Sequence, residues 1–208
     1  MPLVKKIMLE GGVIGLWSIV ESVDDLSLMV HRTDAFKSHN HLGHEKRKTE
    51  FLAVRALLAE LLQEPAEITY KNDGSPSLRG NNLNISISHS RNMVAIILHK
   101  NRVGIDVETV DRPVYKIAAK FLSEQELDFI NGSGAADRLK LLCWCAKETI
   151  FKIAVDKVID FKKHIIIEPF GRSEEGVFNA TYLAPDKTQQ FSLNYLFYEN
   201  NAVVWCVS

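Results

Sequence analysis

Two segments of the chain have apolar side chains at helical spacing. Across residues 49–63 apolar positions recur every three or four residues until Pro65, which predicts a long amphipathic helix. The basic run at 46–48 gives this helix a basic N-terminal end. A second long helix is expected from residue 137 to about 155, and the sequence Ser-Glu-Gln-Glu at 123–126 has the capping-box spacing that starts a shorter helix.

Short apolar runs bounded by turn residues predict the strands. These strands are expected at 83–90, 93–100, 102–110, 164–170 and 190–208, the last with a hairpin turn at Asn200 and Asn201. The apolar runs within residues 1–30 fit strands, or a strand and a short helix. Helices and strands are grouped rather than alternating, which predicts an α+β fold with two halves, 1–101 and 102–208, each holding a long helix and several strands.

Composition indicates an ordinary soluble protein. The chain of 208 residues is 46% hydrophobic and 25% charged with a formal charge of −1, so neither a disulfide framework nor general nucleic-acid binding is expected. Glu10 and the glycines after it interrupt the apolar N-terminus, which favours a cytoplasmic protein without a signal peptide or membrane span. Cys143, Cys145 and Cys206 are odd in number and lack CxxC spacing, so we interpret them as reduced packing residues.

The first candidate for chemistry is a pair of carboxylates within 102–110. On a strand Asp106 and Glu108 point to one face, while Ile105 and Val107 point to the core. Two carboxylates on one face can hold a divalent cation such as Mg²⁺, which takes oxygen ligands and leaves positions for water and substrate phosphate. The alternative is an edge strand with a solvated acidic face.

The second candidate lies on the second long helix. Glu148 and Lys152 are four residues apart and share a helix face, which on its own fits a routine surface ion pair. However, Ile150 and Phe151 surround the pair and Trp144 lies one turn earlier. A charged pair on such an apolar helix is more typical of a cleft than of open water.

A third candidate is the Ser-His-Ser sequence that ends the strand 83–90. Ser88 and His89 carry hydroxyl and imidazole groups suited to a phosphate, whereas a nucleophilic serine would need an elbow motif and an acid partner that the sequence lacks.

The fourth candidate is the basic start of the first helix. Lys46, Arg47 and Lys48, with Arg55 further along, could attract an anion, although a solvated helix end explains them equally well. The three histidines within 39–44 match no metal-ligand spacing and are interpreted as loop residues.

Together, Val-Gly-Ile-Asp-Val-Glu at 103–108 and Trp-Cys-Ala-Lys-Glu-Thr-Ile-Phe-Lys at 144–152 resemble the signature of the 4'-phosphopantetheinyl transferase superfamily. The matching residues are Gly104, Ile105, Asp106, Glu108, Trp144, Cys145, Lys147, Glu148 and Lys152. Ile-Ser-His-Ser at 87–90, and a chain of more than 200 residues, are similar to the Sfp-like branch, in which both halves share one polypeptide. The resemblance covers about residues 44–155.

The resemblance implies two similar α+β halves about a pseudo-twofold axis, with coenzyme A in the cleft between them. It implies transfer of the 4'-phosphopantetheine arm to a serine of an apo acyl carrier protein or peptidyl carrier domain, with release of adenosine 3',5'-bisphosphate. Such an enzyme is of the holo-acyl-carrier-protein synthase type and serves fatty acid, polyketide or nonribosomal peptide biosynthesis. With both halves in one chain we expect a monomer, and neither nucleic acid nor membrane as a partner.

The resemblance also implies roles for individual residues. Asp106, Glu108 and Glu148 would hold Mg²⁺, with Mn²⁺ as a possible substitute, and Glu148 would also take the proton of the carrier serine. Lys152 would stabilise the charge on the pyrophosphate. The residues expected to bind coenzyme A are Lys46, Arg47, Lys48, Ser88, His89, Lys147 and Lys152.

The sequence departs from the family pattern at one triplet, and the carrier-facing surface and two alternative functions remain to be considered. Gly74-Ser75-Pro76 stands where relatives often have Gly-Lys-Pro, so the lysine contact to coenzyme A is missing unless Lys71 or Arg79 replaces it. The candidates for the carrier-facing surface are Arg112, Tyr115, Lys116 and Lys120, with a solvated helix face as the alternative. A catalytically silent module that binds coenzyme A or a carrier, and a metal-dependent phosphohydrolase, are the alternative functions.

Overall fold

The computed structural model describes residues 3–30, 43–154, 158–184 and 187–208. The chain divides into two compact units, Met1–Arg102 and Val103–Ser208, one residue from the division expected between 101 and 102. Each unit combines helices with an antiparallel sheet, which confirms the mixed α+β class. The pseudo-twofold relation between the halves stays a prediction.

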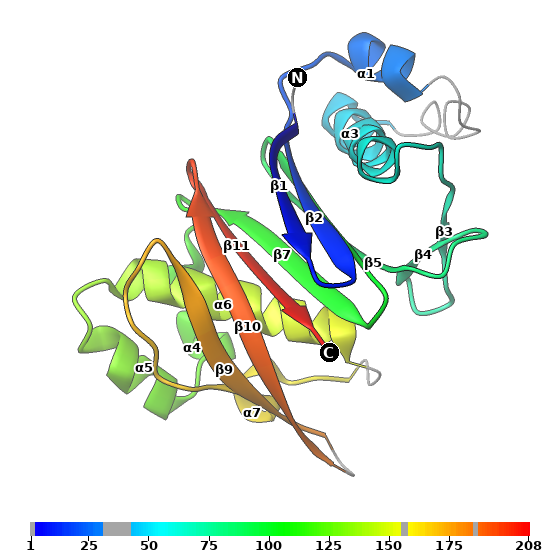
Figure 1. Cartoon of the computed structure of the whole chain (residues 1–208). Coiled ribbons are helices and arrows are strands. Elements are labelled where there is room, and N and C mark those ends of the chain that lie inside the picture. Colours follow the sequence, from blue (N-terminus) through cyan, green and yellow to red (C-terminus); the bar gives the residue numbers. More distant parts are fainter. Residues whose placement is uncertain (1–2, 31–42, 155–157, 185–186) are drawn as a thin grey trace. The chain divides into compact units, whose positions relative to one another are not determined.

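The first unit is a four-stranded sheet with the long helix α3 beside it (Figure 1). Its elements are β1 Leu3–Leu9, β2 Gly12–Ser18, α1 Val23–Val30, α3 Glu45–Leu62, β3 Ile68–Tyr70, β4 Pro76–Leu78, β5 Asn84–Ser90 and β6 Met93–His99. The strand order is β1-β2-β6-β5 with every neighbouring pair antiparallel, and β3 and β4 form a separate ribbon. Gly15 lets β2 and α3 pack closely, since a Cβ there would lie 2.8 Å from Leu57 Cδ1.

The first unit refines two expectations. Residues 3–30 form the β1–β2 hairpin followed by α1, with Gly11 at a positive φ of 87° in the hairpin turn. Helix α3 begins at Glu45 rather than at residue 49, so the basic run at 46–48 lies in its first turn. It ends at Leu62, where Gln63 takes a left-handed conformation with φ 58°.

The second unit is a five-stranded antiparallel sheet crossed on one face by α6 (Figure 1). Its elements are β7 Val103–Thr109, the 3-10 helix η2 Val114–Ile117, α4 Ala118–Phe121, α5 Glu124–Asn131, α6 Ala136–Ile153, α7 Phe161–His164, β8 Ile165–Ile167, β9 Glu175–Leu183, β10 Thr188–Tyr198 and β11 Asn201–Val207. The strand order is β7-β11-β10-β9-β8. Apolar side chains of α6, including Leu142, Ala146 and Ile150, pack in one core with residues of the sheet such as Val204.

The second unit confirms the expected capping box. Ser123 Oγ accepts from the Glu126 amide at 3.2 Å, and Glu126 Oε2 accepts from the Ser123 amide at 2.7 Å. The C-terminal hairpin is present, but its turn is at 199–200, one residue earlier than expected, and strand β9 was not predicted. The predicted end of the second helix near residue 155 falls outside the described residues; α6 ends at Ile153.

All three cysteines are free thiols with buried side chains, as expected for packing residues. No helix in the described part of the chain is long and apolar enough to cross a membrane.

Candidate active site

Strand β7 and helix α6 approach each other closely because β7 carries a glycine. A Cβ on Gly104 would lie 2.3 Å from the Thr149 carbonyl oxygen and 2.9 Å from Ile153 Cγ1, so no larger residue fits without moving the helix. On the helix side, Thr149 Oγ1 donates to the Val204 carbonyl of β11 at 3.1 Å. The glycine of the first motif therefore brings the strand that carries Asp106 against the helix that carries Glu148.

Lys152 joins the two motifs directly. Its Nζ donates to the Ile105 carbonyl at 2.7 Å and to Asp106 Oδ1 at 2.9 Å. Asp106 and Glu108 are both buried although β7 is an edge strand of its sheet, so the alternative of a solvated acidic face is wrong. Burying a carboxylate is costly unless it is paired, and Lys152 supplies that pairing for Asp106.

The charges of Asp106 and Lys152 also act on Glu148. Burial raises the pKa of its carboxyl, the nearby charge of Asp106 raises it further, and Lys152 and Arg112 oppose the shift. A carboxyl group with a raised pKa is a better proton acceptor than an ordinary surface glutamate. Glu148, Asp106 and Lys152 therefore form one interacting cluster rather than a surface pair and a separate strand.

Glu108 is ion-paired with Arg112, which follows it in the segment after β7. The guanidinium of Arg112 also lies 5.0 Å from the centroid of the Trp144 ring. Arg112 pairs with Glu108 and influences Glu148, and since its side chain is 38% exposed its place on the carrier-facing surface stays a prediction.

The carboxylates Asp106, Glu108 and Glu148 have the oxygen donors that Mg²⁺ prefers. Within the described residues, however, no group of three His, Cys, Asp or Glu side chains is arranged to hold a metal ion. Asp106 pairs with Lys152 and Glu108 with Arg112. The donor type thus fits Mg²⁺, two of the three carboxylates are paired with cations in this structure, and the metal assignment stays a prediction.

A comparison with known families identifies the chain by this part of its sequence. Residues 102–206, half of the chain, match the family model of the 4'-phosphopantetheinyl transferase superfamily. The chain belongs to this superfamily. A search of curated proteins gives no match. The family match covers the second unit, which holds both motifs, and does not resolve the Sfp-like branch.

Lys147 of the superfamily motif does not fit its expected role as a phosphate contact. Its side chain is 0% exposed, and its Nζ donates to Glu126 Oε2 at 3.0 Å, to the Phe161 carbonyl at 2.9 Å and to the Ile165 carbonyl at 2.6 Å. An ammonium has three N–H donors, and all three are used here. Burial lowers the pKa of Lys147, and the ion pair with Glu126 opposes that shift.

Glu126 completes this buried group. Its Oε1 lies 2.9 Å from Lys147 Nζ and accepts from the Ile167 amide at 2.8 Å, while its Oε2 accepts from the Ser123 amide. Lys147 and Glu126 therefore tie α5, α6, α7 and β8 together. The sequence held a signal for this role. Cys143 and Ile150, four residues before and three after Lys147, are apolar and share its helix face, and both are 0% exposed in the structure.

The thiols of Cys143 and Cys145 on helix α6 are buried and protonated rather than reactive. Burial raises the pKa of Cys145 well above its ordinary value, and the nearby charge of Asp106 raises it further. Burial likewise raises the pKa of Cys143. Both thiols stay protonated at neutral pH, which agrees with a packing role.

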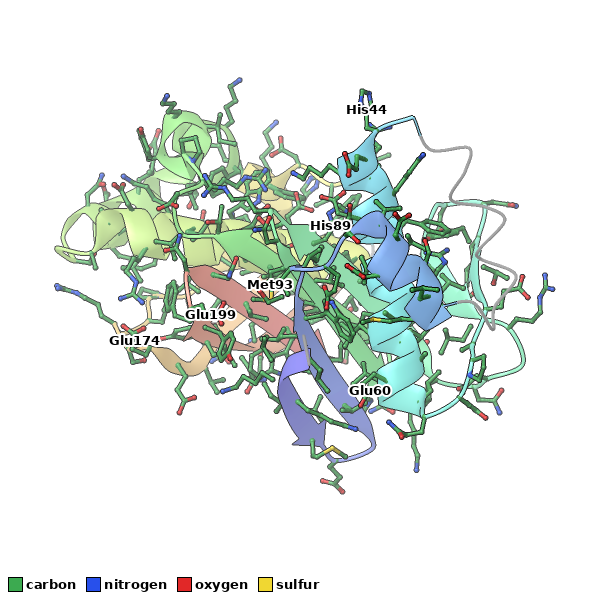
Figure 2. The ribbon with its side chains drawn as sticks, turned by 90° about the horizontal axis from the view of Figure 1, so that it is seen from above. His44, Glu60, His89, Met93, Glu174 and Glu199 are labelled. Carbon is green, nitrogen blue, oxygen red and sulfur yellow. The ribbon has the colours of Figure 1, made fainter. Side chains whose placement is uncertain are left out.

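In the first unit the start of α3 and the end of β5 come together. Glu50 Oε1 lies 3.7 Å from Lys46 Nζ and 3.6 Å from His89 Nδ1, so two of the predicted coenzyme A ligands meet at one carboxylate. Figure 2 labels His89, together with His44 at the N-terminal end of α3. Arg47 is exposed on the same first turn, Lys48 is half-buried, and Ser88 is buried.

Arg55, Ser75 and Arg79 of the first unit have partners within that unit. Arg55 turns inward, donates to the Phe51 carbonyl at 2.9 Å and stacks 3.2 Å from the centroid of the Phe51 ring, so it does not extend the basic run at 46–48. Ser75 Oγ donates to Asp73, and Arg79 pairs with Glu67 at 2.9 Å. Of the three histidines within 39–44, His39 and His41 lie outside the described residues.

Proposed function

We propose that this protein transfers the 4'-phosphopantetheine arm of coenzyme A to a serine of an apo carrier protein, as an enzyme of the holo-acyl-carrier-protein synthase type in the Sfp-like branch. Superfamily membership suggests this reaction. The observation that carries the proposal is the contact of Lys152 with Asp106, which unites the strand and helix motifs in one charged cluster beside Glu148.

The proposed reaction exchanges the phosphoanhydride bond of coenzyme A for a phosphodiester bond to the carrier serine. The serine oxygen of the carrier attacks the phosphorus that bears the pantetheine arm, a new P–O bond forms, and the bond to adenosine 3',5'-bisphosphate breaks. The serine must lose its proton as the new bond forms, and Glu148 is the proposed acceptor of that proton. The raised pKa of Glu148 supports this role, because a pKa closer to neutral pH makes the carboxylate a stronger proton acceptor.

Lys152 is the proposed partner of the pyrophosphate. Its side chain is 26% exposed, and its charge would stabilise the negative charge that increases on the departing bisphosphate. A Mg²⁺ ion held by Asp106, Glu108 and Glu148 would add to this stabilisation. Arg112, which pairs with Glu108, would compete with a metal ion for that carboxylate.

The remaining roles rest on fewer observations. Lys46, Arg47, Lys48, Ser88 and His89 are the proposed ligands of the coenzyme A phosphates; Lys46 and His89 lie close together, and Glu50, which contacts both, would have to yield to the phosphate. The proposed docking surface for the acidic carrier follows β7 and is made of these exposed or basic residues: Arg112, Tyr115, Lys116 and Lys120. Action as a cytoplasmic monomer remains part of the same proposal.

One experiment separates the three candidate functions. The protein is incubated with coenzyme A, Mg²⁺ and apo carrier proteins of fatty-acid, polyketide and peptide-synthetase type, and each carrier is weighed by mass spectrometry. A transferase adds the mass of one phosphopantetheine arm to at least one carrier. A phosphohydrolase consumes coenzyme A without any carrier, and a silent binding module binds coenzyme A in calorimetry but changes neither molecule; either result would refute the proposal.

The role of Glu148 is tested by Glu148→Gln, which keeps the size of the side chain and removes its charge. We expect transfer to fall by about 10²-fold or more, the contribution typical of a positioned proton acceptor. Glu124→Gln is the matched control, since Glu124 is an exposed residue in the first turn of α5. The circular dichroism spectra of both variants should match the unsubstituted protein, and full activity of Glu148→Gln would remove the assignment.

A further inference from the structure

A small pocket in the second unit lies apart from the charged cluster. It has a volume of about 250 Å³ and is lined by the start of α6, the segment 171–174 and Phe197 of β10. Arg138, which lines it, precedes Glu148 by ten residues on α6, or about 15 Å along the helix. The pocket is therefore separate from the residues proposed for the transfer reaction.

One end of the pocket is fixed by a paired arginine. Arg138 donates to Glu174 through two parallel bonds of 2.8 and 2.9 Å, and its guanidinium stacks 3.8 Å from the centroid of the Phe197 ring. The Phe197 amide donates to the Glu174 carbonyl at 2.7 Å, which ties the segment 171–174 to β10. This end is preorganised, and its two charges cancel.

The base of the pocket is apolar. Leu139 and Leu142 are both 2% exposed and belong to the core of the unit, and Phe197 adds an aromatic face. The segment above them is held at a second point, where Ser173 Oγ lies 2.8 Å from the Tyr195 hydroxyl. The base is therefore formed by packed residues, while the wall includes the exposed but paired side chains of Arg138 and Glu174.

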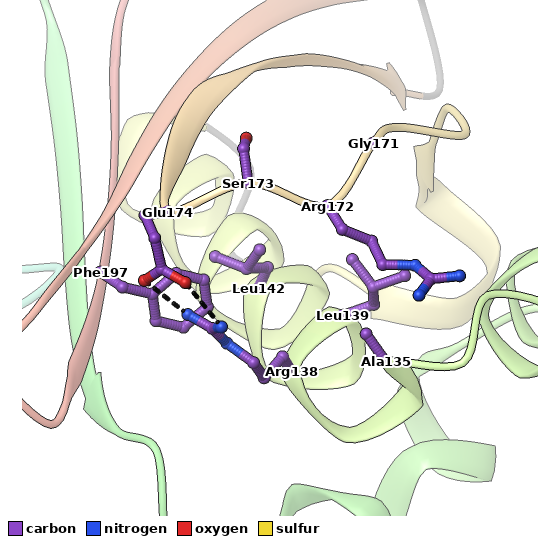
Figure 3. A pocket seen from close by; sticks show the side chains of 9 residues that line it. All are labelled: Ala135, Arg138, Leu139, Leu142, Gly171, Arg172, Ser173, Glu174 and Phe197. Atoms are coloured by element: carbon purple, nitrogen blue, oxygen red, sulfur yellow. Dashed lines mark hydrogen bonds and ion pairs between the residues drawn. The ribbon is translucent and has the colours of Figure 1, made fainter.

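The other end of the pocket carries an uncompensated cation. Figure 3 shows the Arg172 guanidinium at the end opposite the Arg138–Glu174 pair, with Leu139 and Leu142 between them. Among the described residues Arg172 has no hydrogen-bond or ion-pair partner. Gly134 makes room for it, because a Cβ there would lie 3.3 Å from Arg172 Nη1. With Arg138 neutralised, Arg172 gives the pocket a net charge of one positive unit.

We propose that this pocket binds a small monocarboxylate with a short alkyl chain. The guanidinium fork of Arg172 matches a carboxylate in charge and geometry, and the apolar base receives the alkyl chain. A polyanion such as a phosphate ester fits less well, because the Glu174 carboxylate stands at the far end. The volume is slightly below the 300–1,000 Å³ of typical ligand pockets, which limits the ligand to a few carbon atoms.

The test uses the full chain and hexanoate as the probe. Titration of ¹⁵N-labelled protein should give saturable shifts at the amides of Leu139, Leu142 and Phe197, with a Kd of roughly 1 mM as expected for so small a ligand. Acetate, which lacks the alkyl chain, and hexanol and hexylammonium, which lack the carboxylate, should each bind at least about tenfold more weakly. Absence of shifts with hexanoate, or equal binding of hexanol, would overturn the proposal.

Variants locate the charge that matters. Arg172→Gln should weaken hexanoate binding at least about tenfold, and because Arg172 is exposed the variant should fold normally. Lys187→Gln is the matched control, since it removes an exposed cation of the same unit that does not line the pocket. Hexanoate binding that is equal in Arg172→Gln and Lys187→Gln would contradict the assignment.

Discussion

The buried pair of Lys147 and Glu126 gives a sharp test of what the superfamily lysine does. Lys147→Met keeps an unbranched side chain in the site and removes the charge. In the unsubstituted protein Lys147 is 0% and Glu126 1% exposed in their side chains, so the variant would leave the Glu126 carboxylate in the interior without its cation. Removing one partner of such a pair costs about 3–5 kcal/mol. That is a large fraction of the roughly 5–15 kcal/mol that stabilises a typical domain.

The double variant Lys147→Met with Glu126→Leu separates two explanations of that cost. A simple buried ion pair can be replaced by apolar residues with little loss of stability. Here the pair also serves four backbone groups, the carbonyls of Phe161 and Ile165 and the amides of Ser123 and Ile167. Each buried backbone group left without a partner costs about 1–3 kcal/mol. We therefore expect the double variant to be no more stable than Lys147→Met alone.

The assay is urea unfolding followed by far-ultraviolet circular dichroism. Lys140→Met on the same helix is the matched control, because Lys140 makes only a 3.4 Å contact with Asp137, whose side chain is 74% exposed. This control should change the free energy of unfolding by about 1 kcal/mol or less. A loss in Lys147→Met no larger than in the control, or a double variant as stable as the unsubstituted protein, would refute the structural role.

Three further predictions concern the contact of β7 with α6 and the groups around it. Gly104→Ala should lower the free energy of unfolding by about 1–3 kcal/mol in a urea titration, because its Cβ would meet the Thr149 carbonyl; an unchanged midpoint would contradict the close packing. Burial raises the pKa of Cys206 from an ordinary 9.0 to about 12, so the folded state favours the neutral thiol, and the stability this contributes is complete below pH 9 and is lost as the pH rises toward about 12. Iodoacetamide at pH 9 should therefore label Cys206 only after unfolding, and rapid labelling of the folded protein would show the thiol to be accessible. Arg112→Ala should strengthen binding of Mg²⁺ alone about two- to fivefold in calorimetry, since Glu108 loses a competing cation, and weaker binding would show that Arg112 supports the metal site.

Periodicity was sufficient to predict the elements that carry the motifs. The strand expected at 102–110 and the helix expected from 137 are β7 and α6, although Asp106 and Glu108 of β7 and Lys147 of α6 are buried together with the apolar positions. The capping box at 123–126 was equally readable, since its bonds join residues three apart in the chain. Local signals of this kind depend on neighbours in the sequence, and they correctly predicted local structure.

Contacts between distant residues could not be predicted in the same way. Lys147 and Glu126 are 21 residues apart, and nothing in either local pattern shows that they meet. The pairing of Lys152 with Asp106 spans 46 residues, and helical spacing alone suggested Glu148 as its partner. Side-chain roles that depend on how a helix rotates against a sheet appear only once the packing of that helix is known.

The structure divides the superfamily motif into residues that build the unit and residues that remain available for chemistry. Gly104 allows the approach of β7 to α6, and Lys147 is consumed by bonds inside the unit. A catalytically silent relative with the same fold would need these residues as much as an enzyme would, so their presence does not distinguish the two. Glu148 is different, since a carboxyl group with a raised pKa suits proton transfer, and Lys152, which also pairs the buried Asp106, keeps a partly exposed side chain that can reach a substrate. The distinction between an enzyme and a binding module therefore rests on Glu148 and Lys152, and their substitution is the decisive test.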